Sequence, residues 1–483
     1  MGIGRNTLAT AIAFTLAACG GGSSGSSGTA TGGGGSGGSG PTSNCSISAQ
    51  QDFAKAVLDE WYLFPDLMAT GVNKASYSDV QSYIDALIAP ARAQSKDRYF
   101  TYITSIAEEN AYYNSGSSAG FGIRLGYDTG ANRVFVLESF EGGPAYSQGF
   151  DRGTELISVG PDASSLQSIS SLMASGGPNA VINALGDSTA GLRRTFVIRP
   201  LGGSNTQVTV TKADYALDPV SNRYGAKIID DGGKKVGYIN LRTFINTASS
   251  DLRTAFDNFR QQGVTEVIVD LRYNGGGLVA VSSLFADLMG RGNTGQVFAR
   301  LAHRPSKASY DDTYNFTTQP EAIAATRIAF IGSGGTASAS ELLANGFIPY
   351  LGNDMALVGT NTYGKPVGQE AFDKAECDER IRAITFKTVN RDGQGEYFTG
   401  LAPIVPVTCQ AQDDITHALG DPAESSVAQA LAYLRGGPSA CTAIAKAPGA
   451  VAARSITPQM QVGRNLLQPD RPSTPQREVP GLF

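Results

Sequence analysis

Residues 327–370 read RIAFIGSGGTASASELLANGFIPYLGNDMALVGTNTYGKPVGQE. The apolar run 328–331 predicts a strand, and a Gly/Ser turn follows it before Ser338, where a helix is expected to begin. A second short strand, residues 356–358, leads to a loop that carries Lys365. A serine at a strand-to-helix turn and a lysine on a nearby loop are the components of a Ser/Lys nucleophilic site.

A serine hydroxyl needs a base within hydrogen-bond reach and donors for the oxyanion. The chain has two histidines, His303 and His417, and neither lies in a glycine-rich turn. Lys365 is the better base, because its immediate neighbours carry no charge and burial would favour a neutral amine. Gln369 can orient that amine by a hydrogen bond without adding charge. A Ser-His-Asp triad that uses His417 and a neighbouring aspartate is the alternative.

The segment around this stretch, residues 213–437, alternates strands with helices, which predicts an α/β layer with a largely parallel sheet. The expected strand 267–271 is nearly all apolar, as in a sheet that is covered on both faces. Another strand is expected at residues 236–241, and helices are expected at residues 251–261, 279–289 and 425–434.

Residues 117–212 have short β-like runs and resemble a PDZ domain. The loop Gly-Phe-Gly-Ile, residues 120–123, carries much of this resemblance. In PDZ domains such a loop binds the carboxylate of a peptide's C-terminus, here with Phe121, Gly122 and Ile123, and the peptide adds as a strand. Glycine allows the backbone to come close to the carboxylate. The alternative is an unrelated small β domain.

Residues 45–116 are expected to form a small helical domain, since apolar side chains recur there at helical spacing. A stripe of this kind is typical of a core, so we assign no chemistry to it. Residues 438–483 are rich in Pro, Ala and Arg. This C-terminal tail is expected either to hang free or to pack as an extended arm.

Residues 1–19 read as a targeting segment, with Arg5 before a largely apolar run. The sequence Leu-Ala-Ala-Cys that ends at Cys19 resembles a bacterial lipobox, in which the cysteine sulfur is lipidated after cleavage. An ordinary signal peptide is the alternative. Residues 20–44 form a Gly/Ser-rich tether, which is a flexible coil. We therefore expect a lipid-anchored envelope protein, on the outer membrane and facing the periplasm.

The composition limits the number of domains and the classes of function that are possible. A length of 483 residues suggests about three domains, and 41% hydrophobic residues are enough for sizeable cores. The net charge of −5 gives no sign of nucleic-acid binding. Beyond the N-terminus no run of 18 apolar residues occurs, so no transmembrane helix is expected in the mature chain.

Four cysteines remain after Cys19, and an exported chain allows them to form disulfides. Four cysteines permit three pairings. We expect Cys377 to pair with Cys409 and Cys45 with Cys441, which would tie the two ends of the mature fold together. Free buried thiols are the alternative. The spacing is not that of a zinc site, and no metal is expected.

Two motifs resemble those of the C-terminal processing peptidases (tail-specific proteases, peptidase family S41). One is Thr-Ala-Ser-Ala-Ser-Glu, residues 336–341, followed by Thr-Tyr-Gly-Lys at residues 362–365 and by Gln369. The other is Asp-Leu-Arg-Tyr-Asn-Gly-Gly-Gly, residues 270–277, beside the family's Asp-Leu-Arg-Asn-Asn-Pro-Gly-Gly turn. The resemblance covers about residues 50–435. It implies a multidomain α+β protein with a helical domain, a PDZ-like domain and a ClpP/crotonase-like α/β protease core.

The resemblance also implies roles for single residues. Ser338, and not its neighbour Ser340, would be the nucleophile, Lys365 the general base and Gln369 its orienting partner. The oxyanion hole would use the backbone N–H groups of Ala339 and Gly276. No cofactor is implied, and the partners would be proteins or peptides with free C-termini. We interpret Glu341, three residues after Ser338, as an ordinary acid of the first helical turn.

The chain departs from the family pattern in three places. The gap between Ser338 and Lys365 is slightly longer than usual, and the extra residues fall in an expected loop at 347–354. Pro366 replaces a glycine, and Gly275 replaces the proline of the turn. Two other functions stay open: an inactive PDZ-bearing protein that binds peptides or small ligands, and a hydrolase of non-peptide esters.

Overall fold

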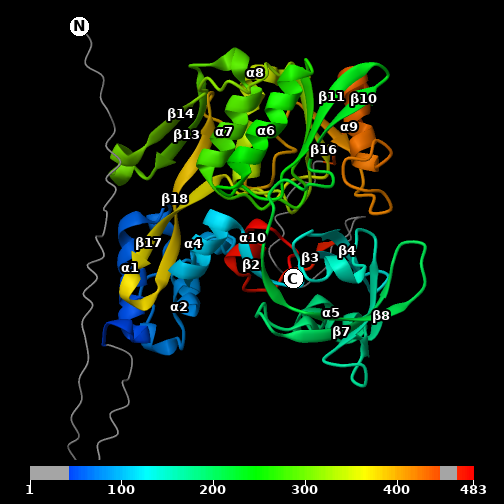
Figure 1. Ribbon diagram of the computed structural model, residues 1–483. Coiled ribbons are helices and arrows are strands. Elements are labelled where there is room, and N and C mark those ends of the chain that lie inside the picture. Colours follow the sequence, from blue (N-terminus) through cyan, green and yellow to red (C-terminus); the bar gives the residue numbers. More distant parts are fainter. Residues whose placement is uncertain (1–42, 446–464) are drawn as a thin grey trace, which may run out of the picture. The chain divides into compact units, whose positions relative to one another are not determined.

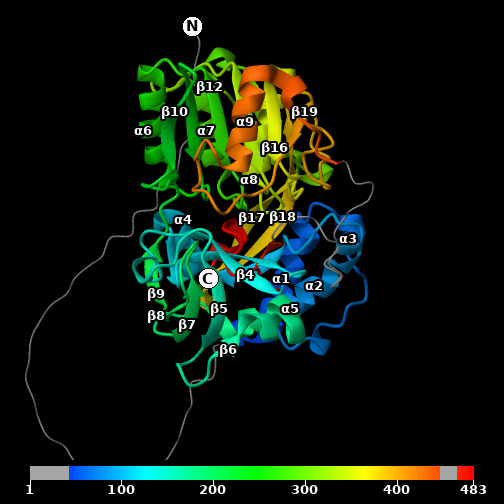
Figure 2. The same ribbon diagram turned by 90° about the vertical axis from the view of Figure 1, so that its right-hand side faces the viewer.

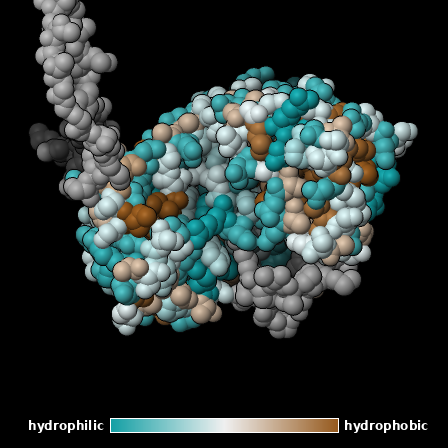
Figure 3. All heavy atoms as spheres, turned by 90° about the horizontal axis from the view of Figure 1, so that it is seen from below, coloured by the Kyte–Doolittle hydropathy of each residue, from teal (hydrophilic) through white to brown (hydrophobic). Residues whose placement is uncertain are grey.

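The computed structural model describes residues 43–445 and 465–483. The expected signal peptide with Cys19, and nearly all of the expected tether, lie outside the described residues. None of the helices in these two ranges is long and apolar enough to span a membrane. On the face drawn in Figure 3, hydrophobic side chains lie in small separate groups among hydrophilic ones.

A six-stranded sheet forms the centre of the α/β layer. Its four adjacent pairs from β11 to β19 are parallel, and β10 joins β11 as an antiparallel hairpin. The strands in spatial order are β10 (Ala226–Asp231), β11 (Lys234–Asn240), β12 (Glu266–Asp270), β15 (Arg327–Gly332), β16 (Met355–Gly359) and β19 (Val407–Gln410). The predicted parallel core is therefore present, and the β10 hairpin strand adds to it.

Helices cover both faces of this sheet (Figures 1 and 2). One apolar cluster joins the sheet to α6 (Ala248–Gln261), α7 (Val279–Met289) and α8 (Ala339–Leu351). Another joins its opposite face to α9 (Ser425–Gly436). Every residue of β12 is buried as a result, which agrees with its continuous apolar sequence. The region 347–351, expected as a loop, continues α8 through Pro349.

A second, antiparallel sheet contains the β-rich unit. Its strands in spatial order are β20 (Asn465–Leu466), β3 (Ile123–Asp128), β4 (Arg133–Ser139), β5 (Glu155–Gly160), β7 (Arg193–Arg199) and β8 (Thr206–Thr211), with β6 (Gln167–Ser168) beside β5. Helix α5 (Ile169–Leu185) packs its buried side chains into the apolar cluster of this unit. The short strands β2 (Ser117–Gly120) and β9 (Ala213–Ala216) pair with each other; in the sequence, β2 comes just before β3 and β9 just after β8.

The N-terminal helices pack against a third sheet. It contains β1 (Tyr102–Ser105), β18 (Glu379–Asn390), β13 (Val297–His303) and β14 (Asp312–Asn315) in this order, with β17 (Val367–Lys374) also paired to β18. Leu58 of α1 (Ile47–Trp61) and Ile84 of α2 (Val80–Leu87) share one apolar cluster with Ile381 and Ile384 of β18. These helices therefore share their core with strands that come some 300 residues later. Two further helices, α3 (Ala89–Ala93) and α4 (Ile106–Ser115), complete the N-terminal part.

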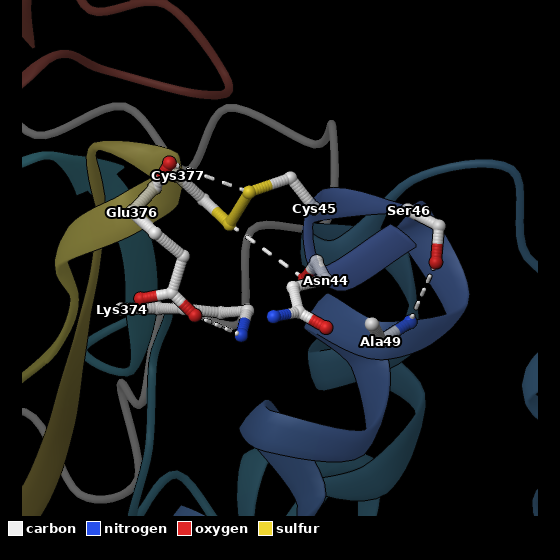
Figure 4. Close-up of a disulfide and its surroundings, with 7 residues drawn as sticks. All are labelled: Asn44, Cys45, Ser46, Ala49, Lys374, Glu376 and Cys377. Carbon is white, nitrogen blue, oxygen red and sulfur yellow. Dashed lines mark hydrogen bonds and ion pairs between the residues drawn. A yellow bond between two sulfur atoms is a disulfide. The ribbon is translucent and has the colours of Figure 1, made fainter. Parts of the chain in front are cut away.

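The disulfides join Cys45 to Cys377 and Cys409 to Cys441, with Cα–Cα distances of 5.5 and 4.5 Å. The predicted pairing is therefore wrong. Cys377 lies in the turn between β17 and β18, directly beside the start of α1, which is where Figure 4 shows Cys45. Cys409 lies in β19, next to the segment that follows α9, and Gln410 N–H donates to Thr442 O there at 2.7 Å.

The described parts of the expected tail are packed. Ile444 is buried in the core of the α/β layer. We call residues 465–483 the tail segment; it contains β20 and the short helix α10 (Thr474–Glu478). Helix α10 contacts α4, and both lie together in Figures 1 and 2. Of the two expectations for this region, the packed arm holds for the described residues, and the free tail does not.

Candidate active site

Ser338 lies where β15 turns into α8. Its backbone has φ 55° and ψ −116°, a region that residues with a side chain rarely adopt. Strain of this kind is found at functional sites, and a serine on a sharp strand-to-helix turn presents its hydroxyl outward. The neighbouring Ser340 is fully buried, and its hydroxyl donates to Asn274 O at 3.1 Å. The geometry therefore favours Ser338 over Ser340 as a nucleophile.

Lys365 lies on the loop after β16 and is partly buried. Its Nζ donates to Gln369 Oε1 at 2.6 Å, and Gln369 in turn donates through Nε2 to Phe100 O. The Phe100 ring centre is 5.2 Å from the amine. Burial lowers the pKa of Lys365 from 10.5 to about 8, although the Glu478 carboxylate partly opposes this shift. Lys365 and Gln369 are thus brought together as the sequence predicted.

Glu341 connects the serine turn to the lysine loop. It is fully buried, and Oε2 accepts from the backbone N–H of Ser338 at 3.1 Å and of Lys365 at 2.7 Å. Its Oε1 accepts from Gly364 N–H at 2.7 Å and from Thr362 Oγ1 at 2.6 Å. Sequence reasoning missed this role, because an acid three residues into a helix is also the pattern of a simple cap.

Arg98 holds the lysine loop from the N-terminal part of the chain. Its Nη2 donates to Tyr363 O at 2.8 Å and to Phe398 O at 3.2 Å, and it also contacts Gly364 O. On the far side, Pro366 O accepts from Thr388 N–H at 2.9 Å. The loop that contains the unusual proline is therefore held from both sides.

The two residues predicted for the oxyanion hole lie beside Ser338. Ala339 is the first residue of α8, where N–H groups have no partner within the helix and the helix dipole favours negative charge. Gly276 has φ 123°, and a Cβ there would lie 2.7 Å from Ser338 Cβ, so only glycine fits. However, the Gly276 N–H donates to Asn274 Oδ1 at 2.9 Å, so it is engaged in this state.

Buried ion pairs fix the turn that carries Gly276. Arg272 donates to Asp270 at 2.8 Å and to Glu424 at 2.8 Å, and all three side chains are almost completely buried. Tyr273 has φ 65°, and its carbonyl accepts from Arg124 Nη2 at 3.3 Å. Its hydroxyl accepts from Arg152 Nη1 at 3.1 Å. Both arginines come from the β-rich unit, so this unit contributes directly to the turn.

A cavity of about 220 Å³ opens at the lysine. Its lining includes Lys365, Ala337 and Gly275 from the site, and Arg477 and Glu478 from the tail segment. The two histidines are not among the lining residues. His417 pairs with Asp414 at 2.7 Å and His303 with Asp311 at 3.3 Å. These positions give no support to the alternative triad with His417.

The three residues predicted to bind a peptide carboxylate lie at the start of β3. The N–H groups of Gly122 and Ile123 donate to Phe483 O at 3.0 and 3.2 Å. Phe121 is fully buried in the apolar cluster of the unit, and its carbonyl accepts from Ala145 N–H at 2.9 Å. Two of the three thus donate to a backbone oxygen, and that oxygen belongs to Phe483 of this same chain.

Fold and site together point to the serine-type peptidases. Residues 235–407 match the model of peptidase family S41, and the chain therefore contains a peptidase family S41 domain. The match covers both ends of the site, from the Asp270–Gly277 turn to Gln369.

Two curated relatives are carboxyl-terminal-processing enzymes. The chain is 26% identical over 326 residues to carboxyl-terminal-processing peptidase 3, chloroplastic, of Arabidopsis thaliana, covering 65% of this chain and 58% of that protein. It is 26% identical over 259 residues to a carboxyl-terminal-processing protease of Picosynechococcus, covering 54% and 57%. The chain thus spans less than two thirds of the length of these relatives.

A solved structure shares the fold. The crystal structure of a Bacteroides fragilis protein assigned as an S41 protease superposes with a TM-score of 0.60 at 20% sequence identity. The match covers 80% of this chain and 97% of that chain. The mixed α/β multidomain architecture is therefore that of S41 protease structures.

Proposed function

We propose that this chain is a serine endopeptidase of the carboxyl-terminal-processing type, with Ser338 as nucleophile and Lys365 as general base. One observation carries the proposal. The amine of Lys365 has a pKa lowered to about 8, is hydrogen-bonded to the uncharged Gln369, and lies on a loop that Glu341 fastens to the Ser338 turn. The feature that distinguishes Lys365 from another buried lysine is that Glu341 links its loop to the Ser338 turn.

In the proposed reaction, the neutral amine of Lys365 takes the proton of the Ser338 hydroxyl as Oγ attacks the peptide carbonyl. The new C–O bond gives a tetrahedral oxyanion, which the Ala339 N–H stabilises. Collapse breaks the C–N bond, and the lysine proton passes to the leaving amine. Water, deprotonated by the same amine, then hydrolyses the acyl-enzyme and restores both groups. Gly276 supplies a second donor once its N–H leaves Asn274.

We also propose that the β-rich unit is a PDZ-like domain that captures the C-termini of substrate proteins. Support comes from the Gly122 and Ile123 N–H groups, which donate to the oxygen of an extended segment. The segment runs antiparallel along β3, as a captured peptide does in strand addition. A free C-terminal carboxylate would offer two such oxygens to the same N–H groups.

The cellular location of the protein is a further part of the proposal. We infer that the protein is anchored by a lipid on Cys19 and acts in the periplasm. The two disulfides support an exported location, because disulfides persist in oxidising compartments.

The test uses quenched fluorescent peptides with apolar C-termini. Ser338→Ala and Lys365→Ala should each lower kcat/KM by at least about 10³-fold, since removal of a member of a nucleophilic pair leaves only the oxyanion donors and binding. Lys387→Ala, which removes an exposed amine paired with Glu396, is the control and should keep full activity. Full activity in both site variants would refute the assignment. Peptide binding without labelling of Ser338 by a fluorophosphonate would favour a binding protein.

A further inference from the structure

The tail segment lies along β3, at the position where the proposed function places a substrate peptide. We call this position the groove beside β3. After β20, Leu467 N–H donates to Leu125 O at 2.9 Å. The chain then passes through α10 and returns to the same strand, where Leu125 N–H donates to Gly481 O at 2.8 Å. Phe483 N–H donates to Ile123 O at 2.9 Å, and its oxygen accepts from Gly122 and Ile123. The last residues of the tail segment are thus bound as an added strand.

The side chains of this strand are buried on both sides. Phe483 is 3% exposed and belongs to the apolar cluster that contains Phe121, Ile123 and, from α5, Val181. Leu482 and Val479 belong to another cluster, with Phe140, Tyr215 and Leu217. Apolar pockets for successive side chains give specificity to strand addition, while the backbone bonds give affinity. The pocket at Phe483 therefore fits a large apolar residue.

The same segment reaches the catalytic turn. Gly275 N–H donates to Glu478 O at 2.8 Å, and a Cβ at position 275 would lie 2.1 Å from Arg477 O. Glycine at this position, in place of the proline of the resembling motif, is what allows the tail segment to lie so close. A proline could neither donate this bond nor leave this space.

The carboxylate of Glu478 lies beside the candidate base. Glu478 is 6% exposed, its Oε1 accepts from Tyr113 OH at 3.1 Å, and its Oε2 has no hydrogen-bond partner within the described residues. Its charge favours the protonated amine of Lys365, and the two groups line the same cavity. With the tail segment in place, part of the wall around the base is therefore supplied by this segment of the chain, and the charge of Glu478 opposes part of the lowering of the Lys365 pKa that burial causes.

One arginine joins the groove to the site. Arg124 of β3 donates through Nε to Pro480 O at 3.2 Å and through Nη2 to Tyr273 O at 3.3 Å. Tyr273 belongs to the turn that carries Gly276. Occupation of the groove and the position of the catalytic turn thus depend on the same side chain.

We propose that residues 474–483 are an internal peptide ligand that occupies the groove beside β3 and forms part of the wall of the cavity at Lys365. A substrate must displace it, and the substrate that does so best is an extended peptide whose last residue is large and apolar. The claim about substrates rests on the proposed function. An internal ligand competes at an effective concentration on the order of millimolar, so displacement needs a tightly bound substrate or a high local concentration.

The experiment measures binding in full-length protein that carries Ser338→Ala, so that no turnover occurs. The probe is a fluorescent peptide with the sequence Glu-Val-Pro-Gly-Leu-Phe and a free carboxylate, followed by anisotropy. Phe483→Ala and Gly275→Ala are added separately to loosen the tail segment. Asn465→Ala, an exposed change in the same segment, is the matched control.

We expect Phe483→Ala and Gly275→Ala to lower the Kd of the probe at least 10-fold, and Asn465→Ala to leave it unchanged. Hydrogen exchange at residues 122–125 and 476–483 should become faster in the first two variants. In the parent, an excess of the probe should speed exchange at residues 476–483 without any substitution. The amidated probe should bind more weakly.

Equal probe binding by all variants, with unchanged exchange in the tail segment, would overturn the proposal. This failure is distinct from failure of the proposed function. The binding assay contains no catalysis, whereas the proposed function fails only if Ser338→Ala and Lys365→Ala remain active. If Phe483→Ala does not fold, Gly275→Ala and the probe-induced exchange of the parent still decide the question.

Discussion

At the residue scale, the proposed mechanism depends on the charge state of one amine. An ordinary lysine with a pKa of about 10.4 is almost entirely protonated at pH 7. Burial brings the pKa of Lys365 to about 8, so that roughly a tenth of the molecules hold a neutral amine at pH 7. Gln369 keeps this balance, because it accepts from the amine without adding a negative charge.

The pH dependence of kcat/KM should therefore report the titration of the Lys365 amine. The neutral amine is the active form, so log kcat/KM should rise with a slope of one as pH increases and level off above about pH 8. Gln369→Glu would place a carboxylate at the amine and stabilise its charged form. We expect the acid limb to move up by at least one pH unit, and the activity at pH 7 to fall about 10-fold.

The control for this substitution is Glu370→Gln, the next residue of β17, whose carboxylate faces His303. Glu370→Gln should not change the pH at which the acid limb of the kcat/KM profile occurs. A uniform loss of activity in Gln369→Glu, with no movement of the limb, would show that another group titrates.

At the element scale, the site is an assembly of the start of α8 and the loop after β16, and Glu341 is the joint between them. Three backbone N–H groups and one hydroxyl point at its two oxygens. Glu341→Gln keeps the volume but turns an amide donor toward these donors. We expect kcat to fall about 10²-fold, because a displacement of about 1 Å between reacting groups has such an effect. KM should change little.

Glu379→Gln is a matched control, because Glu379 is another buried glutamate, on β18, whose oxygens have no hydrogen-bond partner in the part of the chain that is described. It should retain its kcat. If Glu341→Gln kept its kcat as well, the two loops would hold their positions without this carboxylate, and its role would be that of a cap.

Local sequence patterns predicted the elements of the α/β layer well. The strand at β12 and the helix α7 follow from an apolar run and a helical period. Helix α5 was not predicted, because Gly177 and Pro178 interrupt its pattern and the helix kinks there. The Cys45–Cys377 disulfide, and the packing of α1 and α2 against β18, join residues some 300 positions apart, about which local pattern says nothing.

In the candidate site, too, local motifs were predicted and contacts between distant segments were not. Ser338, Lys365 and Gln369 belong to short motifs and were named from the sequence. Glu341 was predicted as an acid of the first helical turn, and its bond from the Ser338 N–H confirms this. Its bonds to the lysine loop were not predicted, because that loop is a separate segment of the chain. The tail segment was not connected with the site at all, since its contacts with β3 and Gly275 exist only in the tertiary structure.

At the scale of the whole molecule, buried charges join the β-rich unit to the α/β layer. Glu138 of β4 contacts Arg124 of β3 and accepts from Arg242 Nε, which follows β11, at 2.6 Å. All three side chains are at most 2% exposed. Because Arg124 also holds Tyr273 and Pro480, this cluster positions the turn, the groove and the tail segment together.

Glu138→Gln tests how much of the fold depends on this cluster. The variant leaves two buried guanidinium groups without their shared counter-charge, which typically costs about 3–5 kcal/mol. Burial raises the pKa of Glu138, but Arg242 and Arg124 outweigh it, and the net pKa lies below 4.5. A lowered pKa gives stability that is present above the unfolded pKa of about 4.3 and is lost as pH falls through the folded value.

Urea unfolding at pH 7 and below pH 4, followed by tryptophan fluorescence and circular dichroism, measures both effects. The loss of unfolding free energy in Glu138→Gln should be largest at pH 7 and should shrink at acid pH, where the wild-type carboxylate is protonated as well. Glu396→Gln removes an exposed partner of Lys387 and should cost less than about 1 kcal/mol. If Glu138→Gln were no more costly than this control, hydrogen bonds and the Arg242–Glu141 ion pair would be enough to hold the two arginines. The link from groove to site would then be sought in the Arg152–Asp413 pair.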